Sequence, residues 1–283
     1  MMNIDYHTLL AKHVDDGSTT LEQHLREVAD AAVLVARHTG LDESIARTGA
    51  LLHDIGKASP YFQKTLKHGY VRRPGRVWRH EIASLLFLSL VPEEQRPCVL
   101  EMIVAHHKSI YHDVGEKGLL DLEDYGDDCF GDHAKDFEQW SPVALNLLSS
   151  LGMKVHPISC DEAYENYLYA VEYCRKRPCG FSQWKGLLMA ADHLVSAVDP
   201  NYQEVASRMF IQPDLSFYER QHPLYPLSLI PTDVPQQHTL VTAPTGAGKT
   251  DFLLRRCRGR VFYTLPFQAS INAMYERINL YYS

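Results

Sequence analysis

The stretch Leu51-Leu52-His53-Asp54-Ile55-Gly56-Lys57 decides the fold, because it sets a polar His-Asp pair at the end of an apolar helix. The periodicity predicts that this helix runs from about Asp42 to Asp54 and stops at Gly56. Side chains at neighbouring helix positions point about 100° apart, so His53 and Asp54 can bind the same metal ion. Taken alone, an ordinary buried polar pair explains these two residues equally well.

The preceding helix carries a histidine on its buried face. Thr19 and Glu22 form a capping box ahead of this helix, and Gly40 ends it. His24 shares the apolar face, where an ionisable ring needs a partner. The apolar residues of that face are Leu21, Leu25, Val28, Ala32, Val35 and Ala36.

Three more expected helices bring an imidazole or a carboxylate into apolar surroundings. His80 opens one of them, His106 and His107 close the next, and Asp192 follows the apolar run 187–191 in the third. A buried carboxylate is costly unless a cation or a hydrogen-bond donor offsets its desolvation. No stretch before residue 210 alternates as a strand, so this part is expected to be all-α. Helices are predicted at about Arg79–Leu90, Arg96–His107, Asp161–Arg175 and Ser182–Val198.

These polar residues together are harder to explain by packing than any one of them. Five histidines and two aspartates exceed what one tetrahedral zinc needs, and they suit two divalent ions with Asp54 between them. The mixture of imidazole and carboxylate favours iron, manganese, nickel or cobalt, with magnesium as an alternative. The predicted metal ligands are His24, His53, Asp54, His80, His106, His107 and Asp192.

The charges of the chain are unevenly spread. A net charge of −7 does not suggest a nucleic-acid binder on bulk electrostatics. Residues 64–80 nevertheless hold six lysines and arginines and no acid, whereas residues 113–138 are rich in acids. Both stretches can be solvated loops. Alternatively, the basic stretch contacts a nucleic-acid backbone beside His80. The aromatic residues that could then stack on bases are Tyr61, Phe62, Tyr70 and Trp78.

The composition changes after residue 210. Several prolines predict an extended linker over residues 213–238. Thr239–Thr242 and Arg260–Leu265 are predicted to be short strands on either side of a glycine loop, as at the start of an α/β domain. In loops of this kind, backbone N–H groups and the lysine contact phosphates, and the threonine hydroxyl contacts magnesium. The glycine loop consists of Thr245, Gly246, Ala247, Gly248, Lys249 and Thr250.

The order His, His-Asp, His, His-His, Asp resembles the HD superfamily in its five-histidine form. The flanking residues resemble, over about residues 13–200, the nuclease domain of the type I CRISPR-associated helicase–nuclease. The segments that carry this resemblance are Leu21–Leu25, Leu52–Lys57, Ala105–His107 and Ala191–Ser196. The glycine loop, with Ala243 at the position of the first Walker glycine, resembles motif I of superfamily 2 helicases, and Tyr263–Pro266 resembles the start of motif Ia.

The resemblance implies roles for individual residues. One ion would be held by His24, His53, Asp54 and Asp192, and the other by Asp54, His80, His106 and His107. Asp54 and Lys57 would be catalytic, with the Lys57 ammonium beside the scissile phosphate. Independently of the resemblance, Ser84 and Ser196 lie one helical turn beyond expected ligands, so they are expected either to hydrogen-bond to those ligands or to be ordinary helix-packing serines, and His13 would also contact the ligands.

The resemblance also implies an activity. Residues 1–212 would form a mainly α HD nuclease domain, and residues 239–283 the incomplete start of a RecA-like helicase domain. The expected reaction is endo- or exonucleolytic cleavage of single-stranded DNA by a metal-activated hydroxide in CRISPR antiviral defence, with a guide-RNA surveillance complex as partner. ATP and magnesium would bind only to an intact helicase, because no downstream Asp-Glu pair or arginine finger is present.

Two other functions stay open. One is an HD phosphohydrolase for nucleotides or signalling phosphates, which would use the same ligands. The other is an inactive metal-binding module that docks to a surveillance complex. No apolar run is long enough to span a bilayer and no signal peptide is visible, so a cytoplasmic location without a membrane partner is expected.

Overall fold

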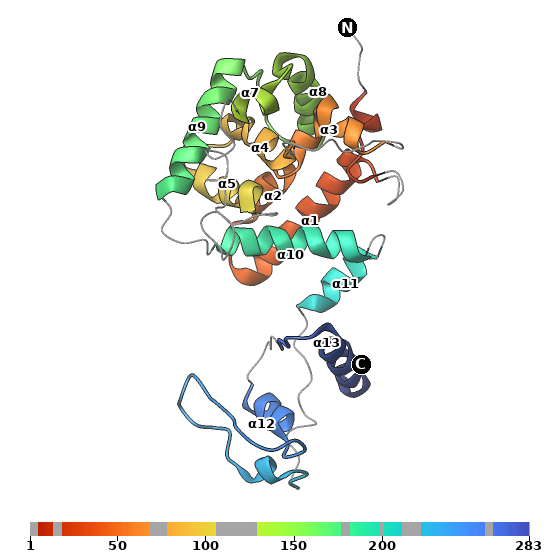
Figure 1. Ribbon diagram of the computed structural model, residues 1–283, viewed down its shortest axis with the longest axis vertical. Coiled ribbons are helices and arrows are strands. Elements are labelled where there is room, and N and C mark those ends of the chain that lie inside the picture. The colour runs from red at the N-terminus through yellow and green to blue at the C-terminus, as the bar shows by residue number, and fades with distance from the viewer. Residues whose placement is uncertain are drawn as a thin grey trace. The chain divides into compact units, whose positions relative to one another are not determined.

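A computed structural model shows two compact units, Met1–Arg208 and Met209–Ser283 (Figure 1). The structure describes residues 5–13, 19–67, 78–105, 129–176, 182–198, 201–210, 222–257 and 263–282. Within these ranges, no helix is long and apolar enough to cross a membrane.

The first unit is helical, as predicted. Its described residues form no strand, and Leu10 and Thr20 make only an isolated antiparallel bridge. Its α-helices are α1 (Leu21–Thr39), α2 (Glu43–Leu52), α3 (Pro60–Thr65), α4 (His80–Leu85), α5 (Arg96–Ala105), α7 (Cys129–Ala134), α8 (Phe137–Ser150), α9 (Cys160–Lys176), α10 (Gln183–Val198) and α11 (Tyr202–Met209), which ends at the unit boundary. Its 3-10 helices are η1 (Tyr6–Thr8), η3 (Ile55–Ala58), η4 (Leu88–Leu90) and η5 (Glu93–Gln95).

Helix α1 lies at the centre of the arrangement that positions the polar cluster. It packs against α2 and α10, while α2 also packs against α5 (Figure 1). The 3-10 helix η3 packs against α4. The side chains of Leu21, Leu25 and Leu52 are completely buried between these helices. Each such side chain contributes roughly 1.5–3 kcal/mol through burial of apolar surface. Burial of the apolar faces therefore fixes where the polar residues on the same helices point.

The N-terminal cap of α1 differs from the prediction by one residue. Thr20, not Thr19, is the N-cap, and its hydroxyl accepts a hydrogen bond from the backbone N–H of Gln23. The reason is the backbone pairing around the Leu10–Thr20 bridge, in which Leu21 N–H donates to the carbonyl of Leu9. Gly40 ends α1 with φ 74°, a left-handed conformation that favours glycine, as predicted.

The His-Asp pair lies at a junction between two helices. Helix α2 begins after its N-cap Asp42 and ends at Leu52, so the predicted end at Asp54 is two residues too late. His53 is the C-cap of α2, and Asp54 precedes η3. The chain therefore changes direction immediately after the pair.

Helix α4 is shorter than the predicted span Arg79–Leu90. It ends at Leu85, and the chain then tightens into i to i−3 hydrogen bonds from Leu86 and Phe87. Phe87 packs there against the rings of Phe137 and Trp140 at centroid distances of 5.4 and 5.6 Å. The predicted span is thus divided between α4 and the 3-10 helix η4.

Part of the acidic stretch is not a solvated loop. Helix α7 and the start of α8 occupy residues 129–138, with His133 and Phe137 buried. The loop interpretation is therefore wrong for this part. Residues 68–77, which contain most of the basic stretch, lie outside the described residues, as do His106, His107 and Tyr70.

The second unit contains η8 (Pro226–Leu229), α12 (Lys249–Arg256) and α13 (Gln268–Tyr282). The predicted strand Thr239–Thr242 is irregular, and so are residues 263–265 of the second predicted strand, while 260–262 lie outside the described part. A strand is stable only when its backbone groups pair with a neighbour, and this unit's described residues offer no second strand. The α/β prediction for residues 239–283 is thus not supported.

The proline-rich segment is tied to α12. Arg255 donates to the carbonyls of Leu227 and Ile230, and Arg256 donates to the carbonyl of Thr232. Residues 226–232 therefore belong to the second unit.

Candidate metal centre

Three imidazoles converge on the carboxylate of Asp54. The Nε2 atom of His24 lies 3.1 Å and that of His53 lies 3.3 Å from Oδ2, while Nε2 of His80 lies 3.0 Å from Oδ1. All four side chains are buried, and they come from α1, the end of α2 and the first residue of α4. Residues far apart in the sequence thus form one polar cluster inside the helical unit.

Asp192 of α10 completes the described cluster. Its Oδ1 lies 3.5 Å from Nε2 of His24, and ligand atoms of His24, His53 and Asp192 all lie within 4.8 Å of one another. The Asp192 side chain is 17% exposed, whereas that of Asp54 is 3% exposed. Asp192 is therefore the more solvent-exposed of the two carboxylates in the cluster.

Lys57 supplies the positive charge beside the buried carboxylate. Its Nζ lies 2.6 Å from Oδ2 of Asp54 and donates to the carbonyl of Ala11 at 3.2 Å. The ammonium also lies 6.0 Å from the centroid of the Phe62 ring. A buried carboxylate is tolerated when it is paired and hydrogen-bonded in this way.

His53 is held in the tautomer that a metal ligand requires. Its Nδ1 lies 2.6 Å from the carbonyl oxygen of Ala50, and because a carbonyl can only accept, Nδ1 carries the hydrogen. The lone pair of the neutral ring is then on Nε2, which faces Asp54. The hydrogen bond from Nδ1 to the Ala50 carbonyl orients the ring, as such bonds do in many metal-binding histidines.

The backbone after the His-Asp pair is packed too closely for any residue but glycine. A Cβ atom on Gly56 would lie 2.1 Å from the carbonyl oxygen of His80 and 2.7 Å from the nitrogen of Ser84. The Gly56 N–H donates to Oγ of buried Ser84 at 2.8 Å. Ser84 therefore joins the turn that carries Asp54 to the helix that carries His80.

The protonation of the cluster follows from burial and from Asp54. Burial lowers the pKa of His24 and of His80, which keeps both rings neutral and able to donate a lone pair. Burial acts in the same sense on His53, but the carboxylates of Asp54 and Asp192 and the hydrogen bond to the Ala50 carbonyl together outweigh it, so the pKa of His53 is raised. A divalent cation binds to the deprotonated ring, so its binding would displace the proton that Asp54 attracts.

The donor set fits a divalent transition-metal ion. Imidazole nitrogens and carboxylate oxygens lie together in one largely buried cluster, which is the ligand mixture that iron, manganese, nickel and cobalt accept. The residues that could hold an ion are His24, His53, Asp54, His80 and Asp192. Because His106 and His107 lie outside the described residues, a second ion stays a prediction.

Ser196 and His13 were also expected to contact the metal ligands. The hydroxyl of exposed Ser196 lies 3.4 Å from Oδ1 of Asp192, a long contact. His13 is half-buried, two residues after Ala11, whose carbonyl accepts from Lys57.

Sequence reasoning missed a charged pair that flanks His80. Nε of Arg79 lies 2.6 Å from Oε1 of Glu81, and both residues are buried. Oε2 of Glu81 lies 3.8 Å from Nδ1 of His80. The signal that could have revealed the pair is an Arg-His-Glu triplet at the start of an apolar helix, where isolated charges are costly.

The glycine loop of the second unit has the backbone that its sequence requires. Gly246 and Gly248 have φ values of 84° and 88°. The Lys249 ammonium donates to the carbonyl oxygens of Ala243 and Pro244 at 2.7 and 2.9 Å. Nucleotide binding by residues 245–250 stays a prediction.

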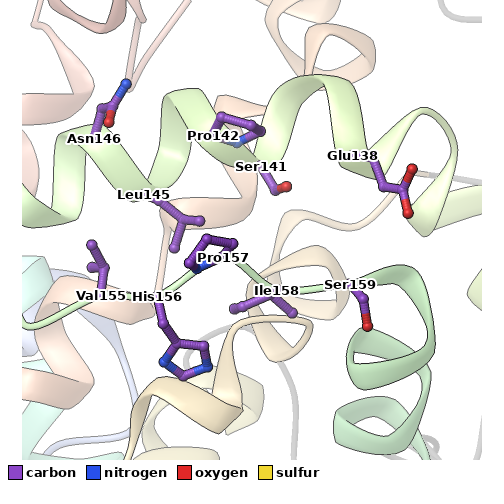
Figure 2. A pocket seen from close by; sticks show the side chains of 10 residues that line it. All are labelled: Glu138, Ser141, Pro142, Leu145, Asn146, Val155, His156, Pro157, Ile158 and Ser159. Atoms are coloured by element: carbon purple, nitrogen blue, oxygen red, sulfur yellow. The ribbon is translucent and has the colours of Figure 1, made fainter.

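A cavity of about 500 Å³ lies away from the cluster, between α8 and the segment that leads into α9 (Figure 2). Pro142, Leu145 and Ile158 line it, together with His156, which pairs with Glu162 at 3.0 Å. No residue of the described metal cluster lines this cavity, so it does not contribute to the candidate centre.

Comparison with known proteins finds a family match within the helical unit. Residues 21–128 match the HD domain family, a range that includes α1, α2 and α4 but not Asp192. Ribonuclease Y from Chlorobium phaeobacteroides (strain DSM 266 / SMG 266 / 2430) is 33% identical over 119 residues. The match covers 42% of this chain and only 18% of ribonuclease Y. No solved structure matches the chain.

Proposed function

From the HD domain at residues 21–128, which indicates a metal-dependent phosphohydrolase, we propose that this chain is a nuclease that cleaves single-stranded DNA. The observation that carries the proposal is the convergence of three buried imidazoles on Asp54, with the Lys57 ammonium at 2.6 Å from the same carboxylate. Such a site combines neutral nitrogen ligands, anionic ligands and a cation for the substrate.

The chain's own residues would orient the substrate and balance its charge. Bound divalent ions would lower the pKa of a water molecule and neutralise the charge that develops on the phosphate oxygens. His24, His53, Asp54 and Asp192 would hold one ion. Asp54 and His80 would hold the second. The Lys57 ammonium would stabilise the negative charge on the phosphate that is attacked.

The surface near α3 suits a polyanionic strand. The exposed lysines Lys64 and Lys135 place their ammonium groups 5.3 and 5.2 Å from the centroid of the Tyr61 ring. Phe62 packs against the ring of His80, and Trp78 packs against His133, so packing contacts already engage both rings. The Tyr61 ring already contacts both ammonium groups and its hydroxyl donates to the carboxylate of Asp136, so Lys64 and Lys135 are the better candidates for contacts to a nucleic-acid strand.

The choice of single-stranded DNA and a role in CRISPR defence with a surveillance complex rest on the sequence resemblance. The name of the relative ribonuclease Y favours RNA as a second candidate substrate. The phosphohydrolase alternative for nucleotides shares the ligands and differs only in the size of substrate that the centre accepts.

One competition experiment separates these functions. The full chain, loaded with Mn²⁺, is offered single-stranded DNA in circular and linear form, RNA of the same sequence in the same two forms, and the four dNTPs. We expect the DNA circle to be cut and the dNTPs to stay intact, with all cleavage lost in a chelator. Cleavage of RNA alone would replace DNA by RNA as substrate, and release of phosphate from dNTPs beside intact DNA and RNA would refute the nuclease.

A further inference from the structure

We propose that His133 of α7 is a positioning residue that fixes the place of His80 in the metal centre. This inference rests on the proposed function, because it takes His80 to be a metal ligand. His133 comes from the acidic stretch, lies 53 residues after His80 and is 5% exposed.

Two hydrogen bonds fix the His133 ring. Its Nε2 accepts the backbone N–H of Arg79 at 2.9 Å, and its Nδ1 lies 2.7 Å from the carbonyl oxygen of Cys129. Because the first partner only donates and the second only accepts, the ring is neutral with the hydrogen on Nδ1. Both nitrogens are thus used in one orientation, and a flipped ring would lose both bonds.

The anchored atom lies directly before the ligand. Arg79 is the N-cap of α4, and its own side chain makes no capping hydrogen bond. His133 therefore holds the backbone of the residue from which α4 starts, and His80 is the first residue of that helix. A shift of the Arg79 backbone would move the His80 ring away from Asp54.

Aromatic contacts connect the same residue to the His80 ring. His133 stacks on Trp78 at a centroid distance of 5.2 Å, and Trp78 donates from Nε1 to the carbonyl of Asp132 at 3.2 Å. Phe62 contacts Trp78 at 5.8 Å and meets the His80 ring edge-on at 5.0 Å. The His80 imidazole is therefore restrained through its backbone and through its ring face.

A matched pair of variants separates the hydrogen bond from the packing. His133→Gln keeps an acceptor at a similar distance from the backbone but loses the ring, whereas His133→Phe keeps a ring for Trp78 but leaves the buried Arg79 N–H unsatisfied. The metal-free full chain and both variants are titrated calorimetrically with Mn²⁺, and thermal unfolding of each metal-free protein is recorded.

We expect the wild type to bind two ions. His133→Phe should bind the ion that His80 holds about 10–100-fold more weakly and the other ion unchanged, while His133→Gln should bind both ions nearly as the wild type does. If His133→Phe binds both ions as the wild type does, or His133→Gln loses the same ion to the same extent, the positioning role is wrong. A wild type that binds no metal would instead refute the proposed function, and the inference with it.

Discussion

Oδ2 of Asp54 lies 3.1 Å from Nε2 of His24, although 30 residues separate them in the sequence. The other carboxylate oxygen, Oδ1, lies 3.0 Å from Nε2 of His80. Asp54 therefore faces ligands from two different helices with its two oxygens. That arrangement is what a carboxylate needs if it is to bridge two ions.

The Ser84 hydroxyl should matter far more for stability than the Ser196 hydroxyl. Ser84→Ala leaves the buried N–H of Gly56 without its acceptor, which should lower the free energy of unfolding by about 1–3 kcal/mol. Ser196→Ala removes a long contact on an exposed residue and should change the free energy of unfolding by less than about 0.5 kcal/mol. Urea unfolding of the metal-free proteins measures both. Equal effects of the two changes would contradict the account of Ser84.

Gly56→Ala should be much more harmful than Gly49→Ala. A Cβ at position 56 meets backbone atoms of His80 and Ser84, which cannot move without moving α4. At position 49 the nearest atom is Sδ of Met102, part of a flexible side chain that can turn away. We expect Gly56→Ala to lower the free energy of unfolding by about 1–3 kcal/mol and to weaken Mn²⁺ binding. Unfolding curves and calorimetric titration of both variants check this, and a harmless Gly56→Ala would disagree.

Lys57→Met should reduce catalysis more than metal binding. The methionine keeps most of the apolar stem but removes the ammonium that lies 2.6 Å from Asp54. Without this cation, the charge on the attacked phosphate is less well neutralised, so kcat should fall about 10²-fold. Steady-state cleavage of the circular DNA and the metal content of the same sample are the measurements. Wild-type kcat in Lys57→Met would show that Lys57 has no part in the reaction.

Acid should remove the stabilising contribution of His133. Burial lowers the pKa of His133, so the folded protein holds a neutral ring while the unfolded chain takes up a proton near its ordinary pKa of about 6.5. The contribution is therefore complete above that pH and falls as the pH decreases, by up to about 1.4 kcal/mol per pH unit. The difference in free energy of unfolding between metal-free wild type and His133→Phe should narrow from pH 8 to pH 5.5. A constant difference would show that the ring is not held neutral.

The helices could be predicted because they depend on local patterns, whereas the polar cluster was expected from the whole set of histidines and aspartates and from the family resemblance. His24 lies on the apolar face of α1, and that face had to be buried, so the direction of its side chain followed from periodicity. His53 and Asp54 followed from the end of an apolar helix in the same way.

Other features could not be predicted because their causes are not local. His133 binds a backbone N–H that lies 54 residues away, and no spacing pattern in the sequence marks such a contact. Thr239–Thr242 has the composition of a strand, but β-structure depends on a pairing partner that the composition does not report.

Metal binding by Asp54→Asn tests the central claim most directly. The chelator-treated full chain is titrated with Mn²⁺ beside Asp54→Asn and Asp30→Asn, where Asp30 is an exposed carboxylate paired with Arg47. We predict two ions per wild-type chain and the same for Asp30→Asn, with affinity in Asp54→Asn at least about 100-fold weaker for both ions. Unchanged binding in Asp54→Asn would contradict a metal centre built on this carboxylate.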